Sequence, residues 1–125
     1  MGISIPMQPL VTYKGAATST TPIIQPAALW LNGQDAMETG LDILILQQAA
    51  GTGTLNLVLE TSISAEGPWT PLATFTGGYC KTTKYFTARE GGTDKFQRFI
   101  RWKLDRSAPT LAEWYITFRI CATVR

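Results

Sequence analysis

Apolar and polar positions alternate with a period of two along much of the chain after residue 40, in runs separated by glycine or proline. The run 113–124 shows this most clearly. Its apolar face comprises Trp114, Ile116, Phe118, Ile120, Ala122 and Val124. Alternation of this kind predicts half-buried antiparallel strands, so we expect Trp102, Trp114, Ile116 and Phe118 in a shared core.

Other runs also read as strands. The run 96–104 alternates, with Trp102 on its apolar face and Arg101 on its polar face. The run 41–49 is largely apolar, which predicts a strand that is buried on both faces. The remaining predicted strands are 54–63, 70–76 and 81–88.

These runs predict an all-β fold. Seven or eight short strands separated by turn residues are typical of an antiparallel β-sandwich, and we expect the jelly-roll type. No stretch combines a period of 3.6 with helix caps, so we expect less than about a tenth of the residues in helix.

The first forty residues follow a different pattern. Residues 1–34 hold four of the seven prolines, which resist a regular helix and central strands. The same segment carries apolar side chains that disordered tails lack. We therefore expect an extended N-terminal arm over residues 1–40 and a sandwich domain over residues 41–125. The expected interface residues are Ile3, Ile5, Leu10, Ile23, Ile24, Trp30, Arg98, Arg101 and Arg119.

The stretch TSISAEGPWTPL, residues 61–72, predicts a chain reversal between two strands. Ser64 can bond to nearby backbone, Gly67 can adopt a positive φ, and Pro68 fixes the exit from the turn. Trp69 then begins a strand, and its ring is expected to close the end of the sandwich. The alternative is that Trp69 stacks on a sugar ring.

Charge adds two observations. Charged residues make up only 16% of the chain, which suggests that a partner covers part of its surface. Residues 1–78 hold one base and five acids, a net charge of −4, and residues 79–125 hold ten bases and four acids, a net charge of +6. Either the two halves favour head-to-tail packing of copies, or their charges interleave within one sandwich.

The residue chemistry argues against an enzyme. The chain has no histidine, so it has no Ser-His-Asp or Cys-His arrangement, and we expect no metal and no cofactor. Cys80 and Cys121 are expected as buried free thiols, with a disulfide between them as the alternative. No signal peptide and no membrane-spanning run is recognised, so we expect synthesis in the cytoplasm.

Nucleic-acid binding is a weaker alternative. The basic side chains that could form one sheet face are Arg98, Arg101, Lys103, Arg106 and Arg119. With nearby aromatic rings such a face can hold a single strand of nucleic acid. A small net charge and alternation along the strands favour an ordinary solvated face instead, so we do not expect nucleic acid as a partner.

The segments LNLVLETSISAEGPWTPLATF, FIRWKL and WYITFRI resemble the small jelly-roll and sandwich domains of tailed-bacteriophage virion proteins, and also discoidin-like sugar-binding sandwiches. The resemblance covers about residues 41–124. The first family implies a non-enzymatic structural protein of the virion, most simply a capsid cement or decoration protein, with a tail or neck component as the close variant. Its partners would be capsid or other virion proteins and further copies of itself, for instance in a trimer. The second family implies a carbohydrate-binding module.

Overall fold

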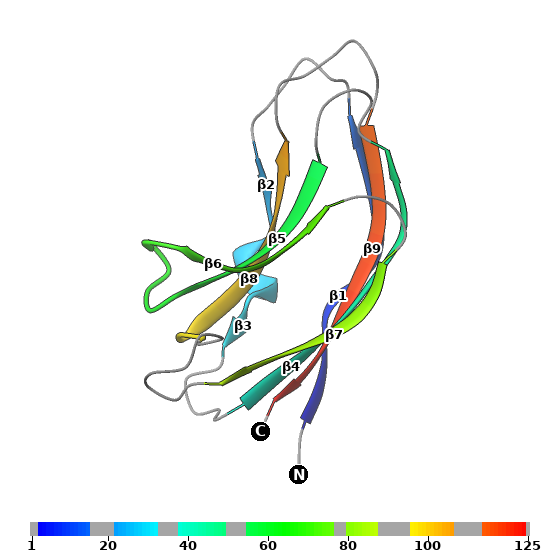
Figure 1. The fold of residues 1–125 in the computed structure, drawn as a ribbon. Coiled ribbons are helices and arrows are strands. Elements are labelled where there is room, and N and C mark those ends of the chain that lie inside the picture. Colours follow the sequence, from blue (N-terminus) through cyan, green and yellow to red (C-terminus); the bar gives the residue numbers. More distant parts are fainter. Residues whose placement is uncertain are drawn as a thin grey trace.

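The computed structural model describes residues 3–15, 22–32, 38–49, 55–76, 80–87, 96–106 and 114–124. Their strands form two antiparallel sheets packed face to face (Figure 1). Sheet A has the spatial order β1 (Ile3–Gly15), β9 (Trp114–Val124), β4 (Glu38–Ala49) and β7 (Cys80–Thr87). Sheet B has the order β2 (Ile23–Ile24), β8 (Phe99–Arg106), β5 (Leu55–Ser62) and β6 (Thr70–Thr76), and β3 (Leu31–Asn32) also pairs with β8.

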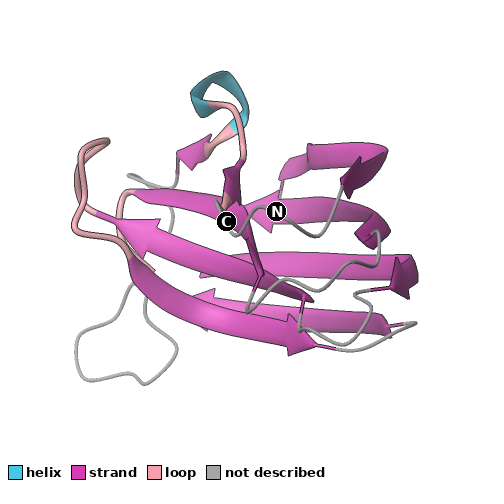
Figure 2. Cartoon of the chain, turned by 90° about the horizontal axis from the view of Figure 1, so that it is seen from above, coloured by secondary structure: helices cyan, strands magenta, loops and turns pink. Residues whose placement is uncertain are grey.

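The strand order identifies the topology. β2 and β3 pair with opposite ends of β8 and act as one interrupted strand. Counted this way, eight strands pass between the two sheets in the double Greek-key order of a jelly roll. Within the described residues the one helical segment is the three-residue 3₁₀ turn η1 (Ala27–Leu29), which lies at the margin of the strands (Figure 2). The predicted all-β jelly-roll sandwich is confirmed.

The core lies between the sheets and follows the predicted facing of β8 and β9. Trp102, Ile116 and Phe118 are each 0% exposed. The rings of Trp102 and Phe118 meet edge to face across the sandwich, with centroids 5.1 Å apart. The side chain of Trp114, which we also expected in the core, lies outside the described residues.

The prediction that 41–49 is buried on both faces is wrong. In β4, Leu41 and Ile43 are buried, but Asp42 is exposed and Leu46 is 41% exposed, because none of the described residues covers the outer face of sheet A at these positions. Leu46 falls at a register shift between Ile45 and Gln47, where a β-bulge leaves one residue without an opposite partner.

The strand that is buried on both faces is β5. Its inward side chains are the buried Leu55, Leu57 and Leu59. On the outer face of the same strand, Val58 is 6% exposed and Glu60 is 3% exposed. A charged residue is buried in this way only if neighbouring groups pair with it and shield it from water.

The segment expected as an arm is extended, but its described parts belong to the sandwich. β1 is the edge strand of sheet A, and Met7 is 1% exposed. Pro6 and Pro9 fall within the two register shifts of the β1–β9 pairing, and an edge position with bulges tolerates proline. Because β2 and β3 also pair with β8, the expected boundary at residue 40 does not separate two packed units.

The two halves of opposite charge interleave in space. β8 lies between β2 and β5, and β9 lies between β1 and β4, so strands of the basic half alternate with strands of the acidic half. An ion pair between Glu60 and Arg101 joins the two halves. Of the two alternatives for the charge asymmetry, this arrangement supports interleaving within one sandwich.

Candidate interaction surfaces

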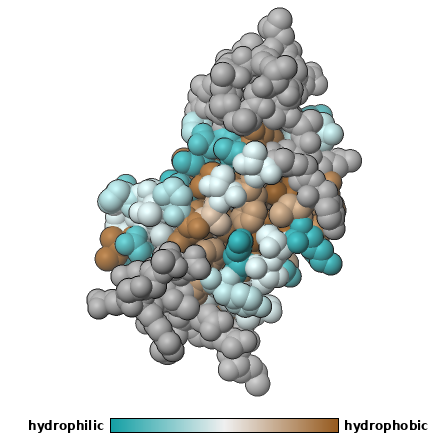
Figure 3. All heavy atoms as spheres, in the orientation of Figure 1, coloured by the Kyte–Doolittle hydropathy of each residue, from teal (hydrophilic) through white to brown (hydrophobic). Residues whose placement is uncertain are grey.

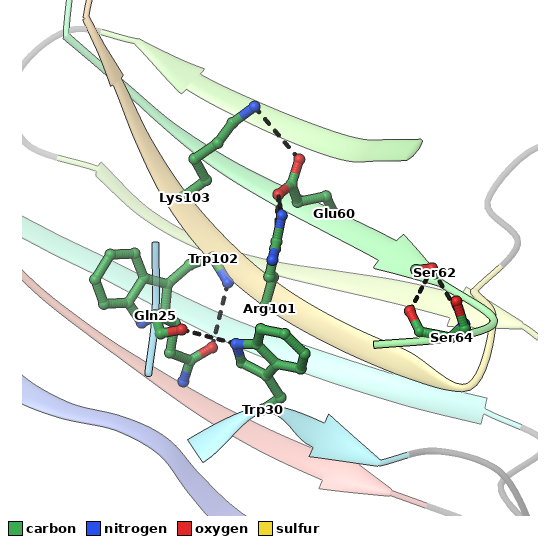
Figure 4. Close-up of polar contacts among 8 residues, drawn as sticks. All are labelled: Gln25, Trp30, Glu60, Ser62, Ser64, Arg101, Trp102 and Lys103. Atoms are coloured by element: carbon green, nitrogen blue, oxygen red, sulfur yellow. Dashed lines mark hydrogen bonds and ion pairs between the residues drawn. The ribbon is translucent and has the colours of Figure 1, made fainter. Parts of the chain in front are cut away.

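The hairpin between β5 and β6 is organised by serine side chains. Ser62 Oγ donates to Ser64 O at 2.7 Å and accepts from Ser64 N at 3.2 Å (Figure 4). Ser64 Oγ donates to Gly67 O at 2.9 Å. Gly67 has a φ of 88°, and a Cβ at this position would lie 2.9 Å from Cδ1 of Trp69. This turn therefore requires glycine, as the sequence predicted.

The hairpin places Trp69 over Arg101 rather than over the end of the sandwich. The Arg101 guanidinium carbon lies 3.7 Å from the centroid of the Trp69 ring and 5.2 Å from that of Trp30. The two tryptophan rings meet edge to face with centroids 4.9 Å apart. Arg101 points away from the core, since its neighbour Trp102 points into it, so all three side chains lie on the outer face of sheet B.

A buried ion pair lies beneath these rings. Arg101 Nε and Nη2 each lie 2.8 Å from Glu60 Oε1, and Lys103 Nζ lies 3.4 Å from Glu60 Oε2 (Figure 4). Arg101 is 9% exposed and Glu60 is 3% exposed. Burying such a pair has a desolvation cost, which charge-assisted hydrogen bonds and the cation–π contact offset. We call Trp30, Glu60, Trp69, Arg101 and Lys103 the arginine–tryptophan cluster.

This cluster joins distant parts of the chain. Trp30 precedes β3, Trp69 precedes β6, and both contact an arginine on β8. Arg101, which we expected at an interface, already has partners within the chain. One face of Trp69 is occupied by Arg101, so packing accounts for this tryptophan without a bound sugar.

Gln25 completes sheet B where β2 and β3 are interrupted. Its backbone N donates to Trp102 O at 3.1 Å, and its Oε1 accepts from Trp102 N at 3.3 Å. Its Nε2 donates to Met7 O at 2.8 Å and to Leu29 O at 3.1 Å. Trp30 Nε1 donates to Gln25 O at 2.7 Å (Figure 4). Gln25 thus links β1 to sheet B.

A second glutamine extends this link into the core. Gln8, 7% exposed, accepts a hydrogen bond from Trp102 Nε1 at 3.0 Å through its Oε1. Sequence reasoning missed both glutamines. The one available signal was an amide side chain within an apolar, proline-rich segment, which does not reveal a buried partner.

Four large aliphatic side chains are exposed along one side of the sandwich. Ile5 and Leu10 on β1 are 37% and 57% exposed, and Ile24 on β2 and Leu29 on η1 are 43% and 45% exposed. β1 and β2 are edge strands of the two sheets, and the Gln25–Met7 hydrogen bond joins them at this side. We call Ile5, Leu10, Ile24 and Leu29 the edge surface.

The other expected interface residues are dispersed. Ile23 is half-buried and packs against the core, and the backbone of Ile3 pairs with Val124 while its side chain lies outside the described residues. Arg98 is exposed, with its guanidinium 4.9 Å from the ring of Phe99. Thus Ile5, Leu10 and Ile24 are exposed on the edge strands β1 and β2, whereas Ile23 packs against the core.

The basic residues considered for nucleic acid do not form one face. Arg101 and Lys103 lie on β8 of sheet B, and Arg98 directly precedes that strand. Arg119 is exposed on the outer face of sheet A, which points the opposite way. The side chain of Arg106 lies outside the described residues. These basic residues cannot share one sheet face, since β8 and β9 lie in different sheets.

Among the described residues, the cysteines and acidic side chains form neither a disulfide nor a metal-binding group. Cys80 and Cys121 are free thiols, and Cys121 is exposed, so the expectation that both are buried is wrong for this residue. In the part of the chain that the structure describes, no three histidine, cysteine or acidic side chains gather into a metal-binding group. Nor does any helix there have the length and apolarity needed to cross a membrane.

Comparisons with known proteins show similarity of fold. No family model and no curated protein matches the chain. A chain in the structure of the infectious bursal disease virus Gx strain matches 99% of this chain with a TM-score of 0.52 and 13% identity. This chain covers only 33% of the length of that viral chain. A chain of Bacillus endospore appendages, described as disulfide-linked pili, matches 99% of this chain and 89% of its own length, with a TM-score of 0.46 and 18% identity. The viral match agrees with the sandwich architecture read from the strand order.

Proposed function

We propose that this chain is a non-enzymatic structural protein of a bacteriophage particle, of the cement or decoration type, which binds the particle through its edge surface. The observation that carries the proposal is the edge surface itself. Ile5, Leu10, Ile24 and Leu29 expose large aliphatic side chains along the adjoining edges of both sheets, in a chain with few charges. Exposed apolar side chains gathered on one side are a mark of protein interaction sites.

The energetics favour a protein partner for this surface. Covering apolar area contributes roughly 25 cal/mol per Å², before the costs of association are subtracted. The side chains project from backbone that is already hydrogen-bonded within the sandwich, because β1 pairs with β9 and Gln25 ties η1 to Met7. A partner would therefore bind an ordered surface and would not have to order this part of the backbone.

The residues also support a role without catalysis. The sequence has no histidine, and the buried carboxylate of Glu60 is paired with Arg101 and Lys103. A general base needs a free site for a proton and access to substrate. The arginine–tryptophan cluster instead fixes the hairpin and the N-terminal segment to sheet B, which suits a rigid building block.

The test is to purify the particles made from the genome that encodes this chain. Mass spectrometry should find the chain in a fixed ratio to the major shell protein, and immunogold labelling should find it on the outside of the shell. Labelling at the tail or neck would overturn the cement role. Absence from the particles, together with saturable binding of an oligosaccharide that the Trp69→Ala variant loses, would favour the carbohydrate-binding alternative.

A further inference from the structure

We infer that two copies of this chain associate through β6, with the two β6 strands antiparallel about a two-fold axis, so that sheet B continues from one copy into the other. Among the described strands β6 pairs only with β5, so its other side has no strand partner there. This inference goes beyond the proposed function, because it does not use the edge surface.

The other sheet edges carry features that oppose pairing with a further strand. β1 has two prolines at two register shifts. β2 and β3 are two residues each, interrupted by η1. β7 presents the exposed Lys81 and Lys84. Each of these is a recognised way to keep strand edges from joining.

β6 carries much less protection. It has no charged residue, and Pro71 and the register shift beside it affect only its first part. From Ala73 to Thr76 the strand is ATFT, uninterrupted and neutral. Threonine and phenylalanine are among the residues that favour strands, so this segment is ready to accept a neighbouring strand.

The side chains beside this edge are apolar. Leu72, Ala73 and Phe75 are half-buried and pack against the core, as does Cys80 on the neighbouring β7. Figure 3 shows apolar side chains gathered at the surface between β6 and β7. A strand added next to β6 would cover part of this apolar surface as well as satisfy the backbone of the edge.

A second copy of β6 is the occupant that fits best. A neutral strand has no like-charge repulsion against itself, whereas two copies of β7 would bring lysines together. If the two-fold axis passes through Thr74, the residues from Ala73 to Phe75 pair with those of the other copy, and Thr76 faces Leu72 at the register shift. In this register Ala73 faces Phe75 of the other copy, so a small side chain opposes a large one on the inner face. The exposed Thr74 then faces its own counterpart on the outer face.

The experiment uses the full chain. In a Cys80→Ser, Cys121→Ser background, Thr74→Cys should form a disulfide-linked dimer on mild oxidation. Thr70→Cys is the matched control, because it is exposed on the same strand but would face residue 78 of the other copy. Equal cross-linking at both positions, or none at Thr74→Cys, overturns the inference.

Solution mass provides a test without cross-linking. Light scattering of the unmodified chain should show a concentration-dependent dimer, and Thr74→Lys should weaken it by about tenfold or more, because an edge lysine opposes strand pairing. Ala65→Lys adds the same charge at the exposed hairpin tip and should leave the dimer intact. A monomer at every concentration, or a dimer that Thr74→Lys does not weaken, contradicts pairing through β6 whatever the particle experiment shows.

Discussion

The Arg101 guanidinium carbon lies 3.7 Å from the centroid of the Trp69 ring, on the outer face of sheet B. The same guanidinium is bonded to the buried carboxylate of Glu60. A single arginine therefore connects the β5–β6 hairpin to the middle of the sheet. This relationship explains how the Glu60 carboxylate can be buried on the outer face of the sheet.

Removing the arginine should destabilise the fold strongly. We expect Arg101→Ala to lower the free energy of unfolding by about 3–5 kcal/mol, because it leaves the Glu60 carboxylate buried with only Lys103 at 3.4 Å. Urea denaturation followed by tryptophan fluorescence measures this. Arg98→Ala is the control, since Arg98 is exposed, and it should change stability by less than about 1 kcal/mol. Equal stability of the two variants would contradict the structural role of Arg101.

Truncating the inter-sheet aromatic contact tests the facing of β9. Phe118→Ala should cost about 3–5 kcal/mol, the usual range for a fully buried phenylalanine. Tyr115→Ala on the outer face of the same strand should cost much less, because Tyr115 is 39% exposed. If the Tyr115→Ala variant were the less stable of the two, the inward and outward faces of β9 would be the reverse of those in the structure.

The requirement for glycine in the β5–β6 hairpin can be tested at Gly67, with Gly40 in β4 as the comparison. Gly67→Ala should destabilise the chain by about 1–3 kcal/mol, because it combines a φ of 88° with a Cβ 2.9 Å from Cδ1 of Trp69. Gly40→Ala should cost less, since its new Cβ would meet the ring of Tyr85 at 3.1 Å, and that exposed side chain can move. Thermal unfolding of both variants measures the difference, and the reverse order would show that the turn is not strained by a side chain at residue 67.

The N-terminal segment should be needed for folding. We expect deletion of residues 1–34 to abolish cooperative unfolding, because it removes β1, β2 and β3 together with the Gln25 bonds to Trp102. Near-ultraviolet circular dichroism of the truncated chain measures the loss of tertiary packing. A truncated chain that still unfolds cooperatively would restore the expectation of a separate arm.

The alternation of side chains predicted the parts of the fold that depend on one strand alone. Trp102 and Phe118 were placed in the core because each lies on the apolar face of its own run. The burial of the outer faces of β4 and β5 was not predicted correctly, because the residues that cover an outer face come from other parts of the chain. Leu46 is exposed at a bulge, while Glu60 is buried by residues as distant as Trp69 and Arg101. Periodicity carries no information about such contacts.

The N-terminal segment shows the same limit. Its prolines correctly excluded a central strand, but the pattern does not show that register shifts can place Pro6 and Pro9 in an edge strand. The hydrogen bond from Gln25 to Met7 spans 18 residues, and no local pattern in the sequence predicts it. Of the expected interface residues, Ile5, Leu10 and Ile24 are exposed, and their role in an interface stays a prediction.

The most direct test of the central claim compares two charge substitutions on the particle. A Leu10→Glu, Ile24→Glu double variant places two carboxylates on the edge surface, whereas Ile63→Glu places one at the hairpin tip, where Ile63 is 68% exposed. Each variant is mixed with particles that lack the chain, and the amount that sediments with them is measured. We expect Ile63→Glu to bind as the unmodified chain does and the double variant, folded by circular dichroism, to remain in the supernatant. Equal binding of a folded double variant would contradict attachment through the edge surface.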